Sequence, residues 1–320
     1  MSKVLTIGSI AYDRIFTIDG AVEDGIILKD GQIKNLDLTF RADDPIIQFG
    51  GTGGNIAYGL GLLGVEATLI GSVGKDFHFD YAKKLKNLNI GVDVHTKEDG
   101  HTATFYGIED KNHKTISIWQ PNVSSMVEEI EIKEVFSSSA EDVRYVIVSA
   151  PGKPVGFEKF LRESKDLFPN AKLIFDPGQD LSFMSKDMIT NCIELCDIII
   201  TNDVEIDQLT KATKMEIENM IDKIEMLVVT KGEDGVTAYL ENGTEINVPA
   251  CKIDEIVQVT GAGDAFRAGL LYGLSNEETL EKSLQFGSVL GSFAVEAMGG
   301  QGYEVTKEEF TNRFKENYED

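Results

Sequence analysis

The chain has 320 residues, of which 42% are hydrophobic and 26% charged, so it is long enough to bury a large core. Its formal net charge is -24, whereas proteins that bind nucleic acid normally present a basic surface. The composition therefore argues against nucleic acid as a partner. It favours an ordered protein whose charge keeps it in solution, and any anionic substrate needs help from backbone dipoles and a metal ion.

Cysteine usage and the first residues indicate the compartment. Cys192, Cys196 and Cys251 are few and odd in number, and we interpret them as buried thiols of a reduced protein. The opening residues, MSKVLTIGS, enter a strand at once and contain no signal-peptide core. No apolar run approaches the ~20 residues that span a membrane. We expect a cytoplasmic protein with no membrane partner.

Short apolar runs that are typical of buried parallel strands alternate with amphipathic stretches. The runs cover residues 4–8, 67–73, 145–150, 172–176, 197–201 and 226–230. The amphipathic stretches predict helices over 55–64, 80–88 and 156–164, and the pattern becomes mostly helical from Gly263. This succession predicts an α/β fold with a doubly wound, mostly parallel sheet, and one domain spanning 1–320.

Two regions interrupt this alternation, about 11–49 and 95–120. The first carries Asp-Gly turn signals at 24–25 and 30–31. The second alternates apolar and polar residues on both sides of the polar turn KNHK, which predicts a β-hairpin. We expect both regions to form a small antiparallel sheet that projects from the main domain. Such a sheet could serve as a lid, as a homodimer interface, or as both.

The stretch VTGAGDAF places small residues directly before an acid at the start of an apolar helix. Gly261, Ala262 and Gly263 let the backbone approach a ligand, and the free N–H groups of a helix start attract anions. The lysine of a Walker A loop is absent. Asp264 beside such an anion hole suits a general base that takes the proton of an attacking hydroxyl. An acid that only satisfies the helix dipole is the alternative, but it leaves the small residues unexplained.

A second glycine-rich stretch, FGGTGGNIAYGLGLLG, covers residues 49–64. Asn55 follows its glycines, and on its own it is typical of a helix N-cap. A turn without side chains also lets a sugar ring lie against bare backbone, where the Asn55 amide would bond a ribose hydroxyl.

Taken together and in order, these motifs resemble the ribokinase-like (PfkB) carbohydrate kinases over essentially the whole chain. The motifs are GSIAYD, GGTGGN, the helix pattern of Ala57, Leu60, Leu63 and Gly64, GSVGKD at 71–76, TNDVE at 201–205, TKGEDG at 230–235, and GAGD. Each is weak alone, but seven in register are specific.

The resemblance implies roles for particular positions. Asp13, Gly51 and Asn55 fall where the family binds sugar hydroxyls. Asn202 and Glu205 fall on the pair that organises Mg²⁺ and phosphate, usually through water, which suits the hard oxygen ligands that Mg²⁺ prefers. Without the other motifs, TNDVE would be interpreted as a helix start with an acid in its first turn.

The remaining motifs fall on the ATP site and on the catalytic turn. Thr230, Gly232 and Gly235 match positions that bind ATP phosphates and ribose, and the alternative is an ordinary turn after a strand. Asp264 matches the catalytic base, and residues 261–263 match the anion hole.

Three further stretches look like the bacterial and archaeal adenosine or nucleoside kinases of the family. These are GDAFRAG, FDPGQ at 175–179, and AVEAMGGQGY, whose late G-x-Q-x-Y is formed by Gly299, Gln301 and Tyr303. Arg267 would orient phosphate or a carboxylate, or else form a supporting salt bridge. Phe105 and Trp119, in the small sheet, would stack on a purine or only pack the sheet.

One position departs from the family pattern. Gln258, Val259 and Thr260 stand where the family commonly has D-T-T or D-P-T. The missing Asp helps many members bind an activating monovalent cation, so the resemblance does not carry K⁺ activation to this chain.

We therefore expect an ATP- and Mg²⁺-dependent kinase that phosphorylates the 5′-hydroxyl of a nucleoside, with adenosine as the first candidate. A sugar kinase of the same family, acting on ribose, fructose or a sugar phosphate, is the main alternative. A non-catalytic nucleotide sensor is another. A dinucleotide-dependent oxidoreductase is disfavoured because GSIAYD, not G-x-G-x-x-G, follows the first strand.

Overall fold

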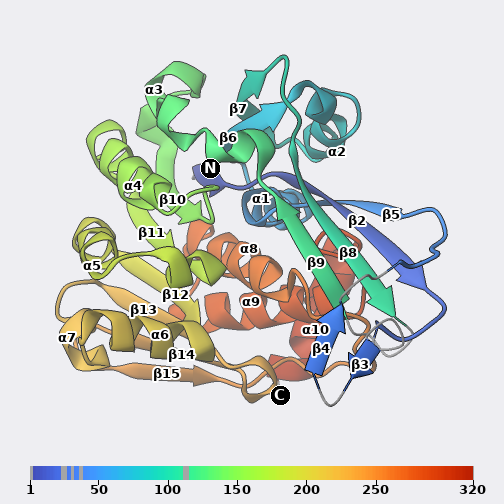
Figure 1. Cartoon of the computed structure of the whole chain (residues 1–320). Helices are drawn as coiled ribbons and strands as arrows, with labels where there is room; N and C mark the ends of the chain where they lie inside the picture. Colours follow the sequence, from blue (N-terminus) through green and yellow to red (C-terminus); the bar gives the residue numbers. More distant parts are fainter. Residues whose placement is uncertain (1–2, 23–26, 30–31, 36–38, 111–114, 320) are drawn as a thin grey trace.

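The computed structural model describes residues 3–22, 27–29, 32–35, 39–110 and 115–319. Within these residues a nine-stranded sheet runs in the order β15-β14-β13-β12-β11-β10-β1-β6-β7 (Figure 1). The strands are β1 (Lys3–Gly8), β6 (Ala67–Gly74), β7 (Gly91–Lys97), β10 (Val143–Ser149), β11 (Lys172–Asp176), β12 (Ile198–Asn202), β13 (Met226–Thr230), β14 (Val236–Leu240) and β15 (Glu245–Val248). The six predicted strands all lie in this sheet and pair in parallel, so the predicted fold class is confirmed. β7 extends the parallel part, and β14 and β15 add an antiparallel edge.

Helices cover both faces of the sheet, because successive side chains of each buried strand point to opposite faces. One apolar cluster joins the sheet to α1 (Thr52–Leu62), α2 (Tyr81–Asn87), α8 (Ala262–Ser275), α9 (Leu280–Val295) and α10 (Lys307–Tyr318). The other joins it to α3 (Ile132–Val135), α4 (Val155–Leu167), α5 (Lys186–Leu195), α6 (Asp203–Thr213) and α7 (Ile217–Ile221). Among the described residues, every helix is too short or too polar to cross a lipid bilayer.

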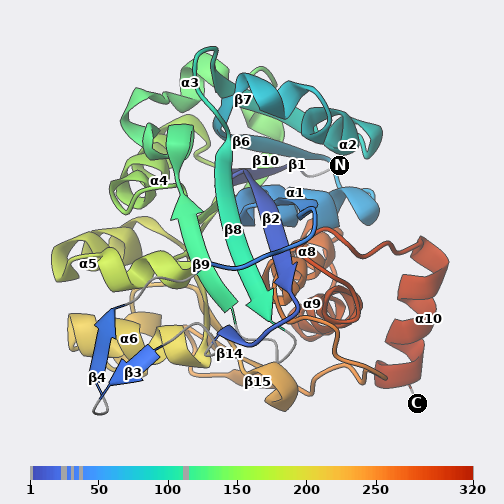
Figure 2. The same cartoon turned by 45° about the vertical axis from the view of Figure 1, so that its right-hand side comes forward.

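A small second sheet projects from one side of the main sheet (Figure 2). Its order is β5-β2-β8-β9, formed by β2 (Ala11–Ile18), β5 (Ile46–Gly50), β8 (Ala103–Asp110) and β9 (Thr115–Gln120). The outer pairs, β5 with β2 and β8 with β9, are antiparallel, which confirms the predicted hairpin around the KNHK turn. The central pair, β2 with β8, is parallel, because both strands continue from parallel strands of the main sheet, β1 and β7.

The predicted limits of the small sheet need one correction. Residues 95–97 belong to β7 of the main sheet, so the hairpin begins at 103. Between β2 and β5, the strands β3 (Ile27–Lys29) and β4 (Gln32–Asn35) pair only with each other among the described residues. The predicted Asp-Gly turns at 24–25 and 30–31, and the KNHK turn at 111–114, lie outside the described residues.

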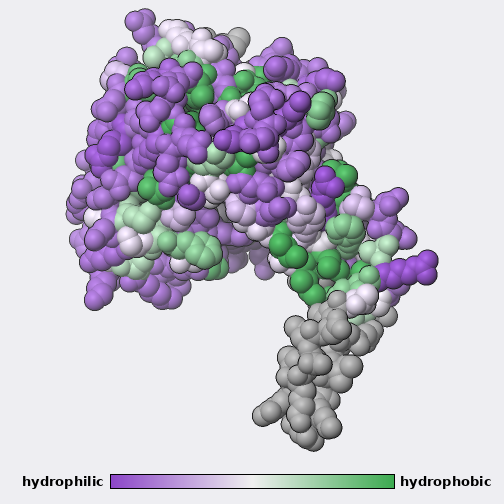
Figure 3. Space-filling model, turned by 45° about the horizontal axis from the view of Figure 1, so that its top comes forward, coloured by the Kyte–Doolittle hydropathy of each residue, from purple (hydrophilic) through white to green (hydrophobic). Residues whose placement is uncertain are grey.

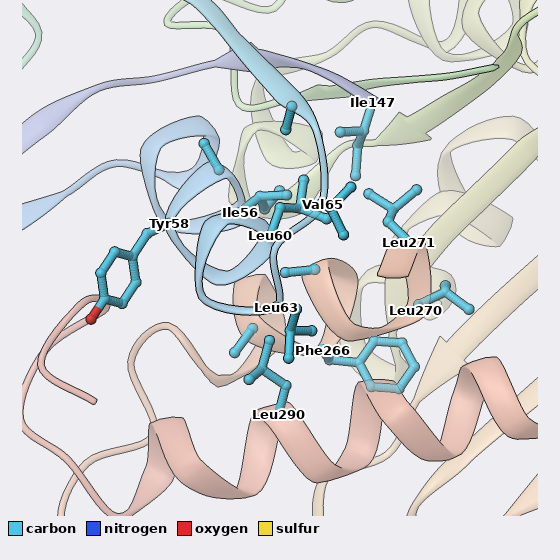
Figure 4. Packing of buried hydrophobic residues seen from close by; sticks show 14 of the residues in the cluster. Ile56, Tyr58, Leu60, Leu63, Val65, Ile147, Phe266, Leu270, Leu271 and Leu290 are labelled. Carbon is cyan, nitrogen blue, oxygen red and sulfur yellow. The ribbon is translucent and has the colours of Figure 1, made fainter. Parts of the chain in front are cut away.

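The packing of α1 against α8 determines where their first turns lie (Figure 4). Leu60 of α1, the C-cap residue Leu63 and Leu271 of α8 are buried in one cluster, and burying each such side chain contributes about 1.5–3 kcal/mol. A Cβ on Gly59 would lie 2.7 Å from the Cβ of Ala268, so glycine is required at this close helix contact. The two glycine-rich helix starts are thereby held side by side.

Candidate active site

Asn55 and Asp264, from the two glycine-rich stretches, are in direct contact. The Asn55 Nδ2 group donates a hydrogen bond to Asp264 Oδ2 at 2.8 Å. The N-cap of α1 is Gly51, so Asn55 lies inside the helix and is not the N-cap that its sequence context also allowed. The side chain predicted to bind the sugar, Asn55, is therefore hydrogen-bonded to the predicted base, Asp264.

The turn before α1 can be formed only with glycine. Gly51 has a φ of 84°, and a Cβ there would lie 2.6 Å from the carbonyl oxygen of Ser9. The carboxylate of Asp13 lies where a Cβ on Gly50 would project, so Asp13 borders the same turn. Burial raises the pKa of Asp13 to about 6. The three predicted sugar-binding residues are thus gathered around one turn.

The small sheet brings both predicted aromatic residues into line with Asp13. In the register of its four strands, Gln48, Asp13, Phe105 and Trp119 are neighbours in one row. Residues paired in this way project from the same face of a sheet. Trp119 is 45% exposed, so its ring is available for stacking.

The start of α8 has the geometry expected of an anion hole. Gly261 is the N-cap with a φ of 84°, and no side chain caps the helix. The Ala262 amide donates to the Val259 carbonyl, and the first intrahelical bond is donated by Ala265. The amides of Gly263 and Asp264 lie between these two and precede Ala265, the first residue whose amide donates an intrahelical bond. Their N–H groups and the helix dipole favour an anion at this point.

Burial raises the pKa of Asp264 to about 7. The guanidinium of Arg267 and the hydrogen bond from Asn55 oppose this shift, while the nearby Asp176 and Asp13 carboxylates add to it. A carboxylate whose pKa lies near neutral pH is suited to accept a proton from a hydroxyl and to release it again.

Arg267 forms the supporting salt bridge considered above. It is buried, and it donates hydrogen bonds to the Asp176 carboxylate and, at 2.9 Å, to the carbonyl oxygen of Gly263. The Ser149 hydroxyl donates to the other oxygen of Asp176. In the sequence Asp176 is only one residue of the FDPGQ stretch, and we expected no separate role for it. Its place as an acid at the carboxyl end of a buried strand is the signal that could have marked it as a site residue.

Asn202 and Glu205 form a capping box at the start of α6. The Asn202 Oδ1 atom accepts from the Glu205 amide at 2.7 Å, and Glu205 Oε2 accepts from the Asn202 amide at 2.9 Å. This is the helix start that TNDVE alone predicts. Glu205 is nevertheless buried near both Asp176 and Arg267; burial and then Asp176 raise its pKa, and Arg267 opposes the shift.

The predicted ATP-binding residues adjoin this helix start. Thr230 ends β13 directly beside Asn202 of β12, and its hydroxyl donates to the Thr201 carbonyl at 3.3 Å. The following turn has positive φ at Gly232, 56°, and at Gly235, 88°. A Cβ on Gly232 would meet open space, so the turn presents bare backbone beside the strand ends.

Gln258, the departure from the family pattern, is engaged within the protein. Its Oε1 atom accepts a hydrogen bond from the Gly299 amide at 2.7 Å. Gly299 itself has a φ of 77°. The neutral side-chain oxygen at this position therefore bonds a backbone N–H group of the C-terminal segment.

The comparison with protein families decides the class. The family model described as pfkB family carbohydrate kinase matches residues 1–307. The chain belongs to this family. As a pfkB kinase, it is a phosphotransferase with an alcohol group as acceptor.

Relatives of this pfkB kinase include several nucleoside kinases. It is 29% identical to the nucleoside kinase of Methanocaldococcus jannaschii over 303 residues, which cover 94% of this chain and 93% of that one. The crystal structure of that enzyme superposes with a TM-score of 0.86 and covers 99% of both chains. A nucleoside kinase of Burkholderia thailandensis, solved in complex with inosine, is 27% identical, with a TM-score of 0.81 and coverage of 99% and 98%.

A sugar kinase is also among the relatives. A probable chloroplastic fructokinase of Arabidopsis thaliana is 29% identical over 283 residues, which cover 81% of this chain and 72% of that protein.

Proposed function

We propose that this pfkB kinase transfers the γ-phosphoryl group of ATP to the 5′-hydroxyl of a nucleoside. The observation that carries the proposal is the contact between Asn55 and Asp264 at the meeting point of two glycine-rich helix starts. A ribose bound at Asp13, Gly51 and Asn55 would have its free hydroxyl next to Asp264. The same hydroxyl would lie beside the uncapped start of α8, and phosphoryl transfer requires an acceptor hydroxyl, a base and an anion site close together.

Each part of the site then has one task in the transfer. Asp264 accepts the proton of the attacking 5′-hydroxyl. The first-turn N–H groups of α8 stabilise the charge on the transferred phosphoryl group. Arg267 holds the Gly263 carbonyl and adds positive charge close to the base. ATP is placed along Asn202, Thr230, Gly232 and Gly235, at the carboxyl ends of β12 and β13.

Mg²⁺ fits the acidic residues on the ATP side. Among the described residues no three His, Cys, Asp or Glu side chains gather into a ready cation site. The carboxylates of Glu205 and Asp176 are nevertheless both buried and close together, so the negative charge of Asp176 disfavours ionisation of Glu205. Mg²⁺ commonly binds through one or two carboxylates, water and substrate phosphates. We assign it to Glu205 and Asn202, where it would neutralise phosphate charge.

Nucleoside is preferred over a simple sugar because of the small sheet. Phe105 and Trp119 share a face with Asp13, so a base attached to a ribose at Asp13 has aromatic surface within the same row. The fructokinase relative supports the alternative of a sugar acceptor. Asp264 would have no task in a protein that only senses nucleotides.

We further propose that residues 1–320 act as one kinase domain and that the small sheet is both its lid and a homodimer interface. The face opposite Asp13 is apolar, with a groove of about 340 Å³ lined by residues that include Phe16, Tyr106, Ile108 and Ile118. Figure 3 shows hydrophobic side chains gathered on this projecting part. Exposed apolar patches of this kind commonly mark interfaces. Sedimentation should show a dimer that Ile118→Asp converts to monomer; a monomeric wild type would contradict the interface.

An acceptor screen tests the proposed function. Mg-ATP consumption is measured with adenosine, guanosine, inosine, cytidine, ribose and fructose 6-phosphate, each beside a reaction without acceptor. We expect turnover with at least one nucleoside, and phosphorus NMR should locate the new phosphate on the 5′-oxygen. Turnover with a sugar alone would establish the alternative. If the enzyme consumes no ATP with any of these acceptors, the proposal is contradicted.

A further inference from the structure

A chain of side-chain hydrogen bonds leads from the glycine-rich turn to the base. The Tyr81 hydroxyl donates to the Gly50 carbonyl at 2.8 Å. The Gln301 Nε2 group donates both to the Tyr81 oxygen and, at 3.1 Å, to Asn55 Oδ1. Asn55 Nδ2 then donates to Asp264 Oδ2. Gln301 lies in the C-terminal segment, far from the other residues in sequence, and no role was predicted for it.

The direction of these bonds is fixed at the Gly50 end. A backbone carbonyl only accepts, so the Tyr81 hydroxyl must donate to it. The Tyr81 oxygen is then left to accept, and Gln301 must present its NH₂ group there. The second hydrogen of that NH₂ group reaches Asn55, which must present its oxygen. The nitrogen of Asn55 is thereby turned toward Asp264.

Close packing holds the two amides in place. Gln301 is 5% exposed and Asn55 is equally buried. A Cβ on Gly300 would collide with the Asn55 amide, and one on Gly54 would collide with the Tyr81 hydroxyl. Lys84 Nζ donates to the Gln301 carbonyl at 2.9 Å and so fixes the backbone of the segment.

We propose that Gln301 is a positioning residue for phosphoryl transfer, which fixes the Asn55 amide with its nitrogen facing Asp264. The proposal rests on the kinase function given above. Without the Gln301 donor, nothing holds the Asn55 oxygen on the side away from Asp264, so the amide is fixed only by its bond to the carboxylate and is free to turn out of line with it. Such a turn weakens the Asn55–Asp264 hydrogen bond, which is a bond to a charged group.

The ionisation of Asp264 reports on this arrangement. The hydrogen bond from Asn55 lowers the pKa of Asp264 and so opposes the effect of burial. Loss of the bond should therefore raise the pKa of Asp264 further above its ordinary value. A residue that merely fills space would leave this pKa unchanged.

Gln301→Glu is the most direct test, because it keeps the shape of the side chain and replaces the donor with an acceptor. We expect kcat with the nucleoside to fall about tenfold, which is the order expected for one hydrogen bond to a charged group. The KM for the nucleoside should rise, the KM for ATP should stay unchanged, and the acidic limb of the pH profile should move to higher pH. Gln301→Met, which removes the donor and adds no charge, should act in the same direction.

Tyr303→Phe is the matched control from the same segment. The Tyr303 side chain is buried and its hydroxyl has no hydrogen-bond partner within the described residues, so this variant should behave as the wild type. Gln301 variants with the wild-type acidic limb, or with equal losses for nucleoside and ATP, would overturn the proposal.

The titration of Asp264, followed by carbon NMR of the labelled carboxyl group, needs no substrate. It separates this proposal from the proposed function. A wild type inactive on nucleosides would contradict the nucleoside as acceptor, while a higher pKa of Asp264 in both Gln301 variants would still support the positioning role. An unchanged pKa would overturn it.

Discussion

The first turns of α1 and α8 begin alike and end with different chemistry. Both helices have a glycine N-cap with a φ of 84°, Gly51 and Gly261, and neither has a side-chain cap. In α1 the amides are satisfied by Ser9: its hydroxyl accepts from Thr52 at 3.0 Å and its carbonyl from Gly54 at 3.2 Å. The start of α1 is therefore anchored to Ser9, the residue after strand β1, and in our proposal only the Asn55 side chain of this turn contacts the substrate.

In α8 the first turn is not tied to a strand in this way. Among the described residues, the Ala262 amide bonds the carbonyl of Val259, and the amides of Gly263 and Asp264 have no acceptor. Asp264 lies within this first turn, and the Arg267 guanidinium donates a hydrogen bond to the Gly263 carbonyl. A glycine-rich helix start thus becomes an anion site only where nothing else satisfies its amides. Where the amides are satisfied, as in α1, a glycine-rich helix start serves to bring the helix close to a neighbouring segment.

The largest expected effect comes from Asp264→Asn. Loss of a general base typically lowers kcat by ~10²–10⁴, while nucleoside binding should remain because the amide still accepts from Asn55. Steady-state kinetics and calorimetric binding measure the two quantities. Asp203→Asn is the control, since Asp203 is also a first-turn acid but is exposed at the start of α6. If both substitutions lowered kcat equally, Asp264 would be only an acid that stabilises the helix dipole, and not the base.

Arg267→Met should cause the next largest loss, this time in stability. It leaves the buried Asp176 carboxylate without its cation, and breaking a buried pair in this way costs about 3–5 kcal/mol. Chemical denaturation measures the free energy of unfolding. The double variant Arg267→Met, Asp176→Leu removes both charges and should recover part of the loss. A single variant as stable as the wild type would show that α8 does not depend on this pair.

Ser9→Ala should have a smaller effect and should act on α1 alone. It removes the acceptor of the Thr52 amide, and one such hydrogen bond contributes about 1 kcal/mol to the free energy of unfolding. Because Ser9 binds no substrate in our account, kcat should stay at the wild-type value. A fall in kcat without a fall in stability would mean that the start of α1 also takes part in catalysis.

Exchange of K⁺ for choline should have the smallest effect. Gln258 has no charge, and its oxygen is already bonded to the Gly299 amide, so we expect kcat to be independent of the monovalent cation. Assays at constant ionic strength measure this dependence. Strong activation by K⁺ would show that other oxygens near α8 bind the cation.

Much of the fold and the site could be predicted from the sequence, because the strands have uninterrupted apolar runs and the site motifs have distinctive glycines. The antiparallel edge of β14 and β15 was missed, since strands this short give little periodicity. Asp176 and Gln301 were seen only as parts of longer motifs. Their partners are Arg267 and Asn55, and only the folded chain brings such distant residues together.

The pH dependence of kcat/KM tests the central claim, that Asp264 is the base, most directly. Burial raises the pKa of Asp264 to about 7, and the base works only when deprotonated. Activity should therefore fall as the pH drops through about 7, with one proton taken up, and this limb should be absent in Asp264→Asn. A profile that is flat through neutral pH, or a limb near pH 7 that persists in the variant, would contradict the account; a lower limb near pH 6 would belong to Asp13.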